Sequence, residues 1–377
     1  MPPRHAYVHV PFCRHRCGYC DFALVAGRDD LVDRYFAAIG RELERLSCPL
    51  DLDTLYLGGG TPSHLGPEGI VRLFALLSTQ LRPVAGAEVT IEANPNDVTE
   101  ALAAAARDCG VTRVSLGAQS LDAGTLRALD RDHTADDVRR AVEILAGRGL
   151  AVNVDLMTAA PGQSLADVAR DLDAAVALGA IHLSVYCLTW EKGTRFESLR
   201  RRGTLERADE AVERAMLELT IDRLEAAGYE HYEVSNFARP GARCRHNEAY
   251  WDCRPWEAFG PGAARFDGRE RITNHRSTTT WMRRVLEGAD AVGDRDTMTA
   301  VEAAQERVVV GLRRRDGLSR AAFLEASGLV LDAVAGAAIA GWVAAGLATD
   351  DGRRVRLTRE GLLVSDSLWV EVLRPAG

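Results

Sequence analysis

The chain has 377 residues, of which 47% are apolar and 27% are charged, the balance of an ordinary soluble globular protein and not of a disordered or fibrous one. Its formal net charge is -8, so the chain is not expected to have the broad basic surface of a nucleic-acid binder. No apolar stretch is long enough to span a membrane. The N-terminus shows no signal-peptide core, so we expect a cytoplasmic protein with one large domain and something smaller.

Strands and helices are predicted to alternate along the first two-thirds of the chain. Runs rich in Val, Ile, Leu or Tyr predict strands at residues 6–10, 54–57, 88–92, 113–116, 151–155 and 181–186. Apolar residues three and four positions apart predict helices at residues 31–46, 67–81, 99–109, 135–148 and 164–178. Thr134 and Ser164 are expected as N-caps, and Gly110 and Gly149 as C-terminal stops. This alternation predicts an α/β fold, a partial (β/α)6, TIM-like barrel over residues 1–235.

The remainder of the chain has a different pattern. A charged amphipathic helix is predicted at residues 207–227, and an irregular stretch broken by Pro and Gly at residues 237–276. We place a connecting segment at residues 236–299 and a C-terminal helical domain at residues 300–377. Helices followed by a short hairpin, with strands at 347–349 and 355–357, resemble a winged-helix module.

Polar, Gly-rich or Cys-bearing segments follow the predicted strands. Catalytic and binding groups of such barrels lie at the carboxyl ends of the strands. The segments at those ends are residues 11–13, 58–61, 92–95 and 117–120, together with Asp155. The agreement between position and chemistry predicts one site at this end of the sheet.

Three of the eight cysteines, Cys13, Cys17 and Cys20, are crowded together near the N-terminus. Thiolates suit iron-sulfur clusters or zinc, whereas a disulfide framework is not expected in a cytosolic chain. A structural zinc site usually takes four ligands in two separated pairs, and no fourth cysteine lies nearby. The spacing therefore favours a cluster with one iron left open, and a zinc protein is the weaker alternative.

The pattern Cys13-x3-Cys17-x2-Cys20, with Tyr19 before the last cysteine, resembles the radical S-adenosylmethionine signature. The resemblance implies a [4Fe-4S] cluster, bound by these cysteines, that donates one electron to S-adenosyl-L-methionine (SAM). The cofactors would supply the chemistry and the protein would bind them and exclude water, so no side chain is expected to be catalytic.

The same resemblance implies the other contacts to SAM. The Gly-rich turn at residues 58–61 allows close approach of a ligand, and it is not a phosphate loop because no Lys-Ser or Lys-Thr follows. The residues that match the SAM contacts of the family are Tyr7, Tyr19, Gly59, Gly60, Thr61, Glu92, Gln119, Arg131 and Asp155. Taken singly, Glu92, Gln119 and Asp155 are better explained as solvated polar residues at strand ends, and the Gly-rich turn as a tight turn. Tyr7 is equally well explained as a half-buried strand tyrosine.

Further motifs resemble the coproporphyrinogen-dehydrogenase-like branch of this superfamily. They are Tyr7-x-His9-x-Pro11-Phe12-Cys13, Tyr56-x-Gly58-Gly59-Gly60-Thr61-Pro62-Ser63, Leu116-Gly117-Ala118-Gln119-Ser120, Asp155-Leu156-Met157 and Pro161-Gly162-Gln163. One departure is Thr158-Ala159-Ala160-Pro161, where the family usually has Gly before Leu-Pro.

Two kinds of protein in this branch compete as interpretations. One is the oxygen-independent coproporphyrinogen III dehydrogenase, a radical SAM enzyme of oxidative decarboxylation, and the other is the HemW-type haem chaperone. The dehydrogenases have a further cysteine two residues after the third, and a longer N-terminal extension. Here Asp21-Phe22 follows Cys20 and a short segment precedes Cys13, which favours the chaperone.

The run His246-Asn247-x-x-Tyr250-Trp251 matches a motif of the chaperones. Imidazole ligates haem iron and aromatic faces cover the macrocycle, so His246 is the expected haem ligand. A histidine hydrogen-bonded within a Trp-rich loop is the alternative. Cys244 and Cys253 flank the motif as alternative ligands or as plain buried thiols.

The sequence thus predicts a haem chaperone that binds a [4Fe-4S] cluster, SAM and haem, with the dehydrogenase as the alternative. The expected partners are haem, haem-accepting proteins and an electron donor. Nucleic acid is not expected, and a membrane would be reached only through an acceptor protein. The sequence leaves open whether the chain forms a homodimer.

Overall fold

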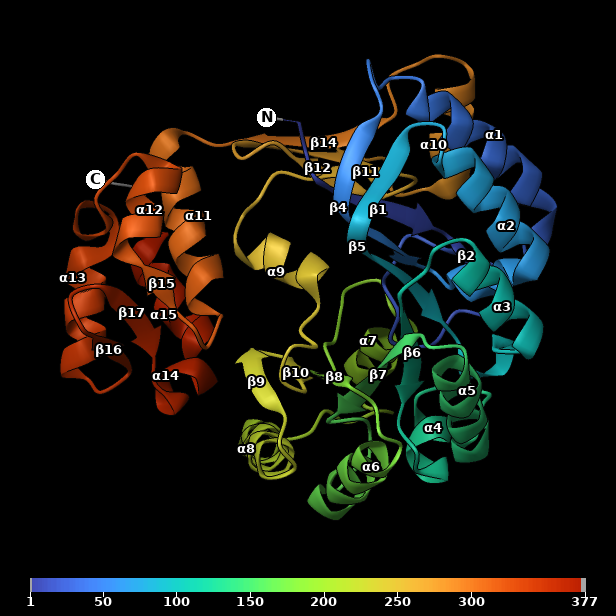
Figure 1. Cartoon of the computed structure of the whole chain (residues 1–377). Coiled ribbons are helices and arrows are strands. Elements are labelled where there is room, and N and C mark those ends of the chain that lie inside the picture. Colours follow the sequence, from blue (N-terminus) through green and yellow to red (C-terminus); the bar gives the residue numbers. More distant parts are fainter. Residues whose placement is uncertain (1, 374–377) are drawn as a thin grey trace.

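A computed structural model describes residues 2–373 and confirms the predicted α/β fold (Figure 1). Within these residues the main sheet has nine strands, in the order β11-β1-β4-β5-β6-β7-β8-β10-β9. Six neighbouring strands run parallel: β1 (His5–Val10), β4 (Leu50–Gly59), β5 (Leu81–Ala93), β6 (Arg113–Gln119), β7 (Ala151–Thr158) and β8 (His182–Cys187). The sheet does not close, because β11 (Glu257–Phe259) forms one edge and antiparallel β10 (Asn236–Ala238) and β9 (Glu230–Glu233) lie beyond the other end. This is the expected partial barrel.

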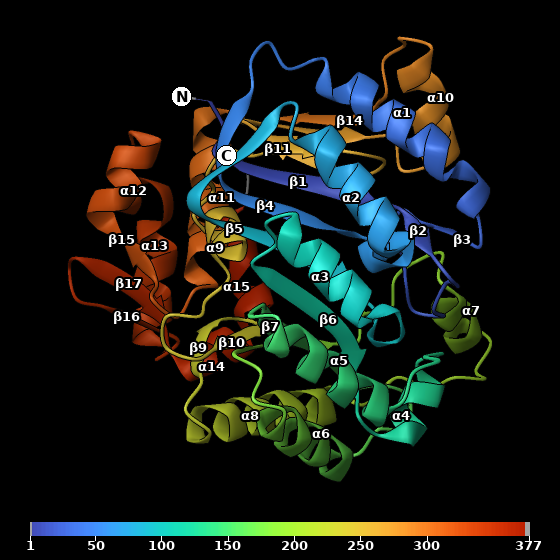
Figure 2. The same cartoon turned by 45° about the vertical axis from the view of Figure 1, so that its right-hand side comes forward.

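Helices cover the outer face of this sheet (Figures 1 and 2). They include α1 (Val32–Leu43), α2 (Gly66–Leu77), α3 (Glu100–Asp108), α5 (Ala135–Gly147), α6 (Leu165–Ala177) and α8 (Glu210–Ala226). The short helices α4 (Ala123–Ala128) and α7 (Arg195–Arg201) belong to the segments that follow β6 and β8. Thr134 and Ser164 form the predicted N-terminal caps, each with a reciprocal bond to an Asp three residues later. Gly110 and Gly149 have positive φ angles after their helices, as the predicted stops require.

The inward face of the barrel is polar. Along β7, Val152 and Val154 are buried against the helices, whereas Asn153 and Asp155 alternate to the inside. Asn153 Nδ2 donates to Ser184 Oγ on β8 at 3.1 Å. Barrels of this kind are usually filled with branched aliphatic side chains, so a polar interior provides room and partners for a polar ligand.

The prediction of an irregular stretch at residues 237–276 is wrong. It contains α9 (Arg245–Trp251), β11, β12 (Ala264–Phe266) and β13 (Glu270–Asn274), and α10 (Thr278–Leu286) and β14 (Val292–Thr297) follow. These strands are short, and pairing with β1 or with each other, rather than local sequence, defines them. The helix predicted at 67–81 also ends early, since Leu81 begins β5 and pairs with Leu50.

The C-terminal part has the expected helices and hairpin. α11 (Ala300–Leu312), α12 (Arg320–Ser327) and α13 (Leu331–Ala344) pack on a small sheet of β15 (Leu318–Ser319), β17 (Arg354–Leu357) and β16 (Ala348–Asp350). Two short helices that the sequence did not indicate, α14 (Arg359–Leu363) and α15 (Ser365–Val372), complete it. This tail has its own buried core and lies beside α9 and β9 (Figure 1). The boundaries proposed at residues 236 and 300 stay a prediction. Across residues 2–373, no helix has the length and apolar character that crossing a bilayer requires.

Candidate functional site

The three clustered cysteines lie on the loop that follows β1. Short strands β2 (Phe12–Cys13) and β3 (Val25–Ala26) pair at the base of this loop, where the Gly27 N–H donates to the Cys13 carbonyl at 3.0 Å. The Arg16 guanidinium donates to three carbonyls in the second half of the loop, at 2.8–3.2 Å. The protein alone therefore fixes the fold of the cysteine loop.

A cavity of about 730 Å³ opens at the carboxyl ends of the parallel strands. It brings together most of the site residues predicted from the sequence: Cys13, Cys17, Tyr19, Cys20, Gly59, Gly60, Thr61, Glu92, Gln119, Arg131 and Asp155. They come from the loop after β1, from the ends of β4, β5, β6 and β7, and, for Arg131, from the segment between α4 and α5. Its size is that of an ordinary ligand pocket.

The thiols line one wall of this cavity. Cys13 and Cys17 are buried and Cys20 is half-buried, and Cys13 Sγ lies 3.2 Å from Thr61 Oγ1. Burial raises the pKa of Cys13 to about 12 and also raises that of Cys20, so iron must displace their protons on binding. In the described part of the chain, no three His, Cys, Asp or Glu side chains are placed to hold a single metal ion. Three thiols that line one cavity are the type of ligand that an iron-sulfur cluster uses, and zinc stays the weaker alternative.

The Gly-rich turn is required by the protein itself. Gly59 has a φ of +106°, and a Cβ there would lie 2.3 Å from the His9 ring. A Cβ on Gly60 would lie 2.7 to 2.9 Å from backbone atoms of Val10 and Phe12. The sequence assigned these glycines to ligand approach, but they also let the end of β4 pack against the base of the cysteine loop.

Two carboxyl groups lie on the inner wall. Glu92 accepts from the Tyr56 hydroxyl and from the Gly59 N–H, both at 2.9 Å. Burial, and then the charge of Asp155, raise the pKa of Glu92 to about 7. Burial also raises the pKa of Asp155 to about 6, although Ser115 donates to it at 3.0 Å. Both are suited to accept from hydroxyl or amino groups of a ligand.

Arg131 brings a positive charge to the same cavity. One terminal nitrogen lies 3.5 Å from Cys17 Sγ, and the other donates to the Gly117 carbonyl at 2.9 Å. Its Nε is buried and has no hydrogen-bond partner among residues 2–373. Gln119 has a φ of +62°, a strained conformation for a side chain of its size that is typical of functional sites. Thiols, carboxyls and a guanidinium with a free N–H together fit a cluster and an amino-acid-bearing nucleotide.

Comparison with known proteins agrees with this geometry. Residues 7–175 match the model of the radical SAM superfamily, and residues 298–364 match that of the HemN C-terminal domain. The heme chaperone HemW of Mycobacterium tuberculosis is 38% identical over 97% of this chain and 94% of its own length. HemW of Bacillus subtilis is 31% identical over 97% of this chain and 98% of its own length.

The chain belongs to the HemW family. The solved structure of coproporphyrinogen III oxidase (HemN) from Escherichia coli has the same fold, with a TM-score of 0.86 over 98% of this chain and 90% of that one. At 21% identity, that likeness concerns the fold alone.

Two predicted residues lie outside the cavity lining. Tyr7 donates toward His9 Nδ1 at 3.1 Å and stacks on Tyr56, which does line the cavity. His246, from the HemW-family motif, is 1% exposed, with Nδ1 2.7 Å from the Thr54 hydroxyl and Nε2 3.0 Å from the Tyr250 hydroxyl. Ligation of haem by His246 would therefore require it to leave one of these bonds, and it stays a prediction.

The sequence analysis did not predict several residues that line the cavity. Asn153, Ser184 and Tyr186 line the cavity from inward positions of β7 and β8. The polar alternation along β7 was the signal that could have identified Asn153. Arg313 and Asp366 reach the cavity from the tail, 2.9 Å apart, and no local pattern could place them there.

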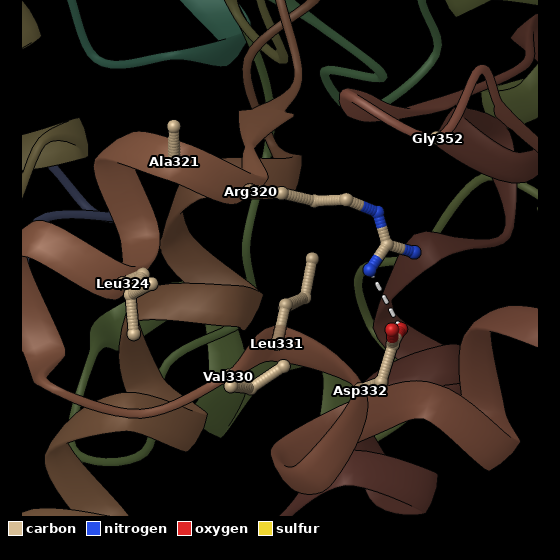
Figure 3. Close-up of a pocket in the computed structure, with 7 residues that line it drawn as sticks. All are labelled: Arg320, Ala321, Leu324, Val330, Leu331, Asp332 and Gly352. Atoms are coloured by element: carbon tan, nitrogen blue, oxygen red, sulfur yellow. Dashed lines mark hydrogen bonds and ion pairs between the residues drawn. The ribbon is translucent and has the colours of Figure 1, made fainter.

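A second pocket, of about 520 Å³, lies wholly within the tail (Figure 3). Arg320 pairs there with Asp332 at 2.7 Å, beside the apolar side chains of Leu324 and Val330. No cysteine or histidine lines it. The residues expected for the HemW family point to the barrel cavity as the functional site.

Proposed function

We propose that this chain is a haem chaperone of the HemW type. It binds a [4Fe-4S] cluster and SAM in the barrel cavity, takes up haem and delivers it to haem-accepting proteins. The observation that carries the proposal is the gathering of the three cysteines and the predicted SAM residues around one cavity, in a chain similar to HemW proteins along nearly its whole length.

Cys13, Cys17 and Cys20 hold the cluster in this proposal, and Arg131 offsets the negative charge of the bound thiolates. When bound, the cluster and SAM supply one-electron chemistry at the sulfonium. Glu92 and Asp155 accept from hydroxyl and amino groups, and the backbone around Gly60 and Thr61 holds the polar end of the ligand. Tyr19, Gly59 and Gln119 complete the SAM pocket.

The cluster and SAM part is tested by anaerobic reconstitution with iron and sulfide. We expect about four irons per chain and a visible absorption band that changes when SAM is added. The Cys17→Ala variant should lose both. The matched control is Cys48→Ala, because Cys48 is exposed and lies outside the cavity. A wild-type protein without iron, or with a band that ignores SAM, would contradict the proposal.

The chaperone part is tested on the same reconstituted protein. We expect haem to bind and to pass to an apo-haem acceptor protein, while coproporphyrinogen III remains unconverted under strict anaerobiosis. Formation of protoporphyrinogen IX together with 5′-deoxyadenosine would support the dehydrogenase instead. For the partners in the cell, only their classes are proposed: an electron donor and haem-accepting proteins.

A further inference from the structure

Asp130 lies directly behind the cysteine loop in an unusual backbone conformation. Its φ of +54° is left-handed, which an L side chain adopts at a cost. One carboxylate oxygen accepts from the Gly18 N–H at 3.0 Å, and the other accepts from Arg195 at 3.1 Å. The Asp130 carbonyl also lies 2.8 Å from His15 Nε2. A strained residue with three bonds around one loop indicates a selected role.

Gly18 shows how tightly this contact is built. It lies between the second and third cysteines, and its carbonyl accepts from the Phe196 N–H at 2.8 Å. A Cβ on Gly18 would lie 2.3 Å from the Phe196 ring and 2.6 Å from the Asp130 carboxylate. At Gly18 the cysteine loop therefore packs closely against both Asp130 and the start of α7, and these two are joined by the Asp130–Arg195 pair.

Asp130 and Arg131 have different positions relative to the cavity. Arg131 lines it and contacts Cys17 Sγ, whereas Asp130 does not line it. The negative charge of Asp130 nevertheless lies one peptide unit from Cys17 and is partly neutralised by Arg195. Charges and hydrogen bonds close to ligating sulfurs control the potential of an iron-sulfur cluster.

We propose that Asp130 is a positioning residue of the cluster site, which holds the cysteine loop through the Gly18 N–H and, with Arg195, sets the reduction potential of the cluster. The second half of this statement rests on the proposed cluster binding, and the first half concerns the protein alone. Reduction adds one electron to the cluster, so a nearby carboxylate opposes it and a paired guanidinium relieves that opposition.

Hydrogen exchange of the apo-protein tests the contact without any cluster. In Asp130→Ala the Gly18 amide should exchange about tenfold faster than in the wild type, because a charge-assisted bond is lost. Asp130→Asn should stay near the wild type, since the amide oxygen still accepts and Asn tolerates the left-handed conformation. Equal exchange in wild type and Asp130→Ala would overturn the contact. If Asp130→Ala fails to fold while Asp130→Asn folds and keeps its protection, the contact is supported.

Anaerobic redox titration of the reconstituted protein tests the charge. Asp130→Asn should raise the reduction potential of the cluster by about 59 mV, which corresponds to about a tenfold change in the one-electron equilibrium constant. Arg195→Gln should lower the reduction potential. The control is Asp136→Asn, an equal charge change at an exposed residue of α5 that pairs only with Arg139. Unchanged potentials, or shifts of one sign in both variants, would overturn the proposal. Failure to bind any cluster would overturn the proposed function and the potential-setting role, while the exchange result would still decide the contact.

Discussion

At the scale of single residues, Glu92 and Asp155 place two carboxyl groups in one low-dielectric cavity. Burial disfavours ionisation of both, and the charge of Asp155 further disfavours ionisation of Glu92. In the apo-protein, Glu92 is therefore largely protonated at pH 6 and largely ionised at pH 8. The ionised form of Glu92 can accept hydrogen bonds from hydroxyl groups of a ligand.

The pH dependence of apo-protein stability follows from this. The folded-state pKa of Glu92 is raised from 4.5 to about 7, so its stabilising contribution is present below pH 4.5 and is lost as pH rises through 7. The wild type should lose unfolding free energy between pH 5 and pH 8, and in Glu92→Gln we expect this loss to be smaller by about 1–3 kcal/mol. Denaturant unfolding of wild type and variant at both pH values measures this. Parallel pH profiles would contradict it.

Ala159 explains the local departure from the family pattern. It has a φ of +59°, in the position where the family usually has Gly. The left-handed conformation costs a non-Gly residue about 1–2 kcal/mol, and the entropy that Gly gains in the unfolded chain offsets about 0.4–1 kcal/mol of this. We expect Ala159→Gly to raise the unfolding free energy by about 0.5–1 kcal/mol. Ala160→Gly, at the adjacent buried residue without a positive φ, should instead lower it.

His246, the haem ligand predicted from the motif, lies buried in the structure. The motif identified a histidine among aromatics, but burial and two hydroxyl partners leave neither ring nitrogen free. We expect His246→Ala to lower the unfolding free energy by about 1–3 kcal/mol, because Thr54 and Tyr250 lose a buried partner. As the predicted haem ligand, His246 should be needed for haem binding, so we expect His246→Gln, which can still hydrogen-bond to Thr54 and Tyr250, to stay folded but to lose the haem signal in a spectroscopic titration. Unchanged haem binding in this variant would contradict the prediction. Loss of haem binding in a stably folded His246→Gln would show that this residue is the ligand.

At the scale of secondary structure, the end of β4 is built against the base of the cysteine loop. Gly60 contacts backbone atoms there, which cannot move aside as a flexible side chain can. We expect Gly60→Ala to lower the unfolding free energy by about 1–3 kcal/mol and to reduce the iron retained after reconstitution. The control is Gly341→Ala, in the exposed interior of α13 with open space at its Cβ, which should add up to about 1 kcal/mol. Equal effects of the two substitutions would contradict this account.

The elements that the sequence predicted well are those whose signal is local. The capped helices and the six parallel strands have strong periodicity and bounded ends, and the cysteine spacing fixes the chemistry of the loop. The elements that were missed, such as α9 and β11, are short and depend on tertiary pairing. The same limit applies to the site residues. A motif indicates which residues are functional, but it does not show which face of a strand or helix they occupy, and His246 is an example.

At the scale of the whole molecule, the barrel and the tail have separate apolar cores, and several ion pairs join them. Arg243 pairs with Asp316 at 2.6 Å, and Arg271 pairs with Glu306 at 2.6 Å. Arg314 of the tail lies among Asp252, Glu248 and Asp316. A local sequence pattern cannot predict these ion pairs, because the paired residues lie far apart in the chain. Since Arg313 and Asp366 line the cavity, the docked tail supplies part of the cavity wall.

Docking of the tail should therefore depend on salt and on Arg314. The Arg315 N–H donates to the Tyr232 carbonyl at 3.0 Å across this contact, so its hydrogen exchange reports docking. We expect exchange at Arg315 to accelerate between low salt and about 1 M salt, where the screening length falls to about 3 Å. Arg314→Gln should weaken docking by about 1–2 kcal/mol, more than an exposed pair contributes, because its side chain is only 19% exposed.

The matched control for Arg314→Gln is Arg283→Gln, which breaks an exposed pair with Glu287 at the C-terminal end of α10. It should leave the exchange of Arg315 unchanged, because it removes a pair of similar chemistry that does not cross the contact. Amides of the barrel core and the tail core should stay protected in both variants. Loss of protection throughout either core would mean that Arg314 stabilises folding and not docking. Exchange at Arg315 that ignores both salt and Arg314→Gln would mean that apolar packing holds the tail in place.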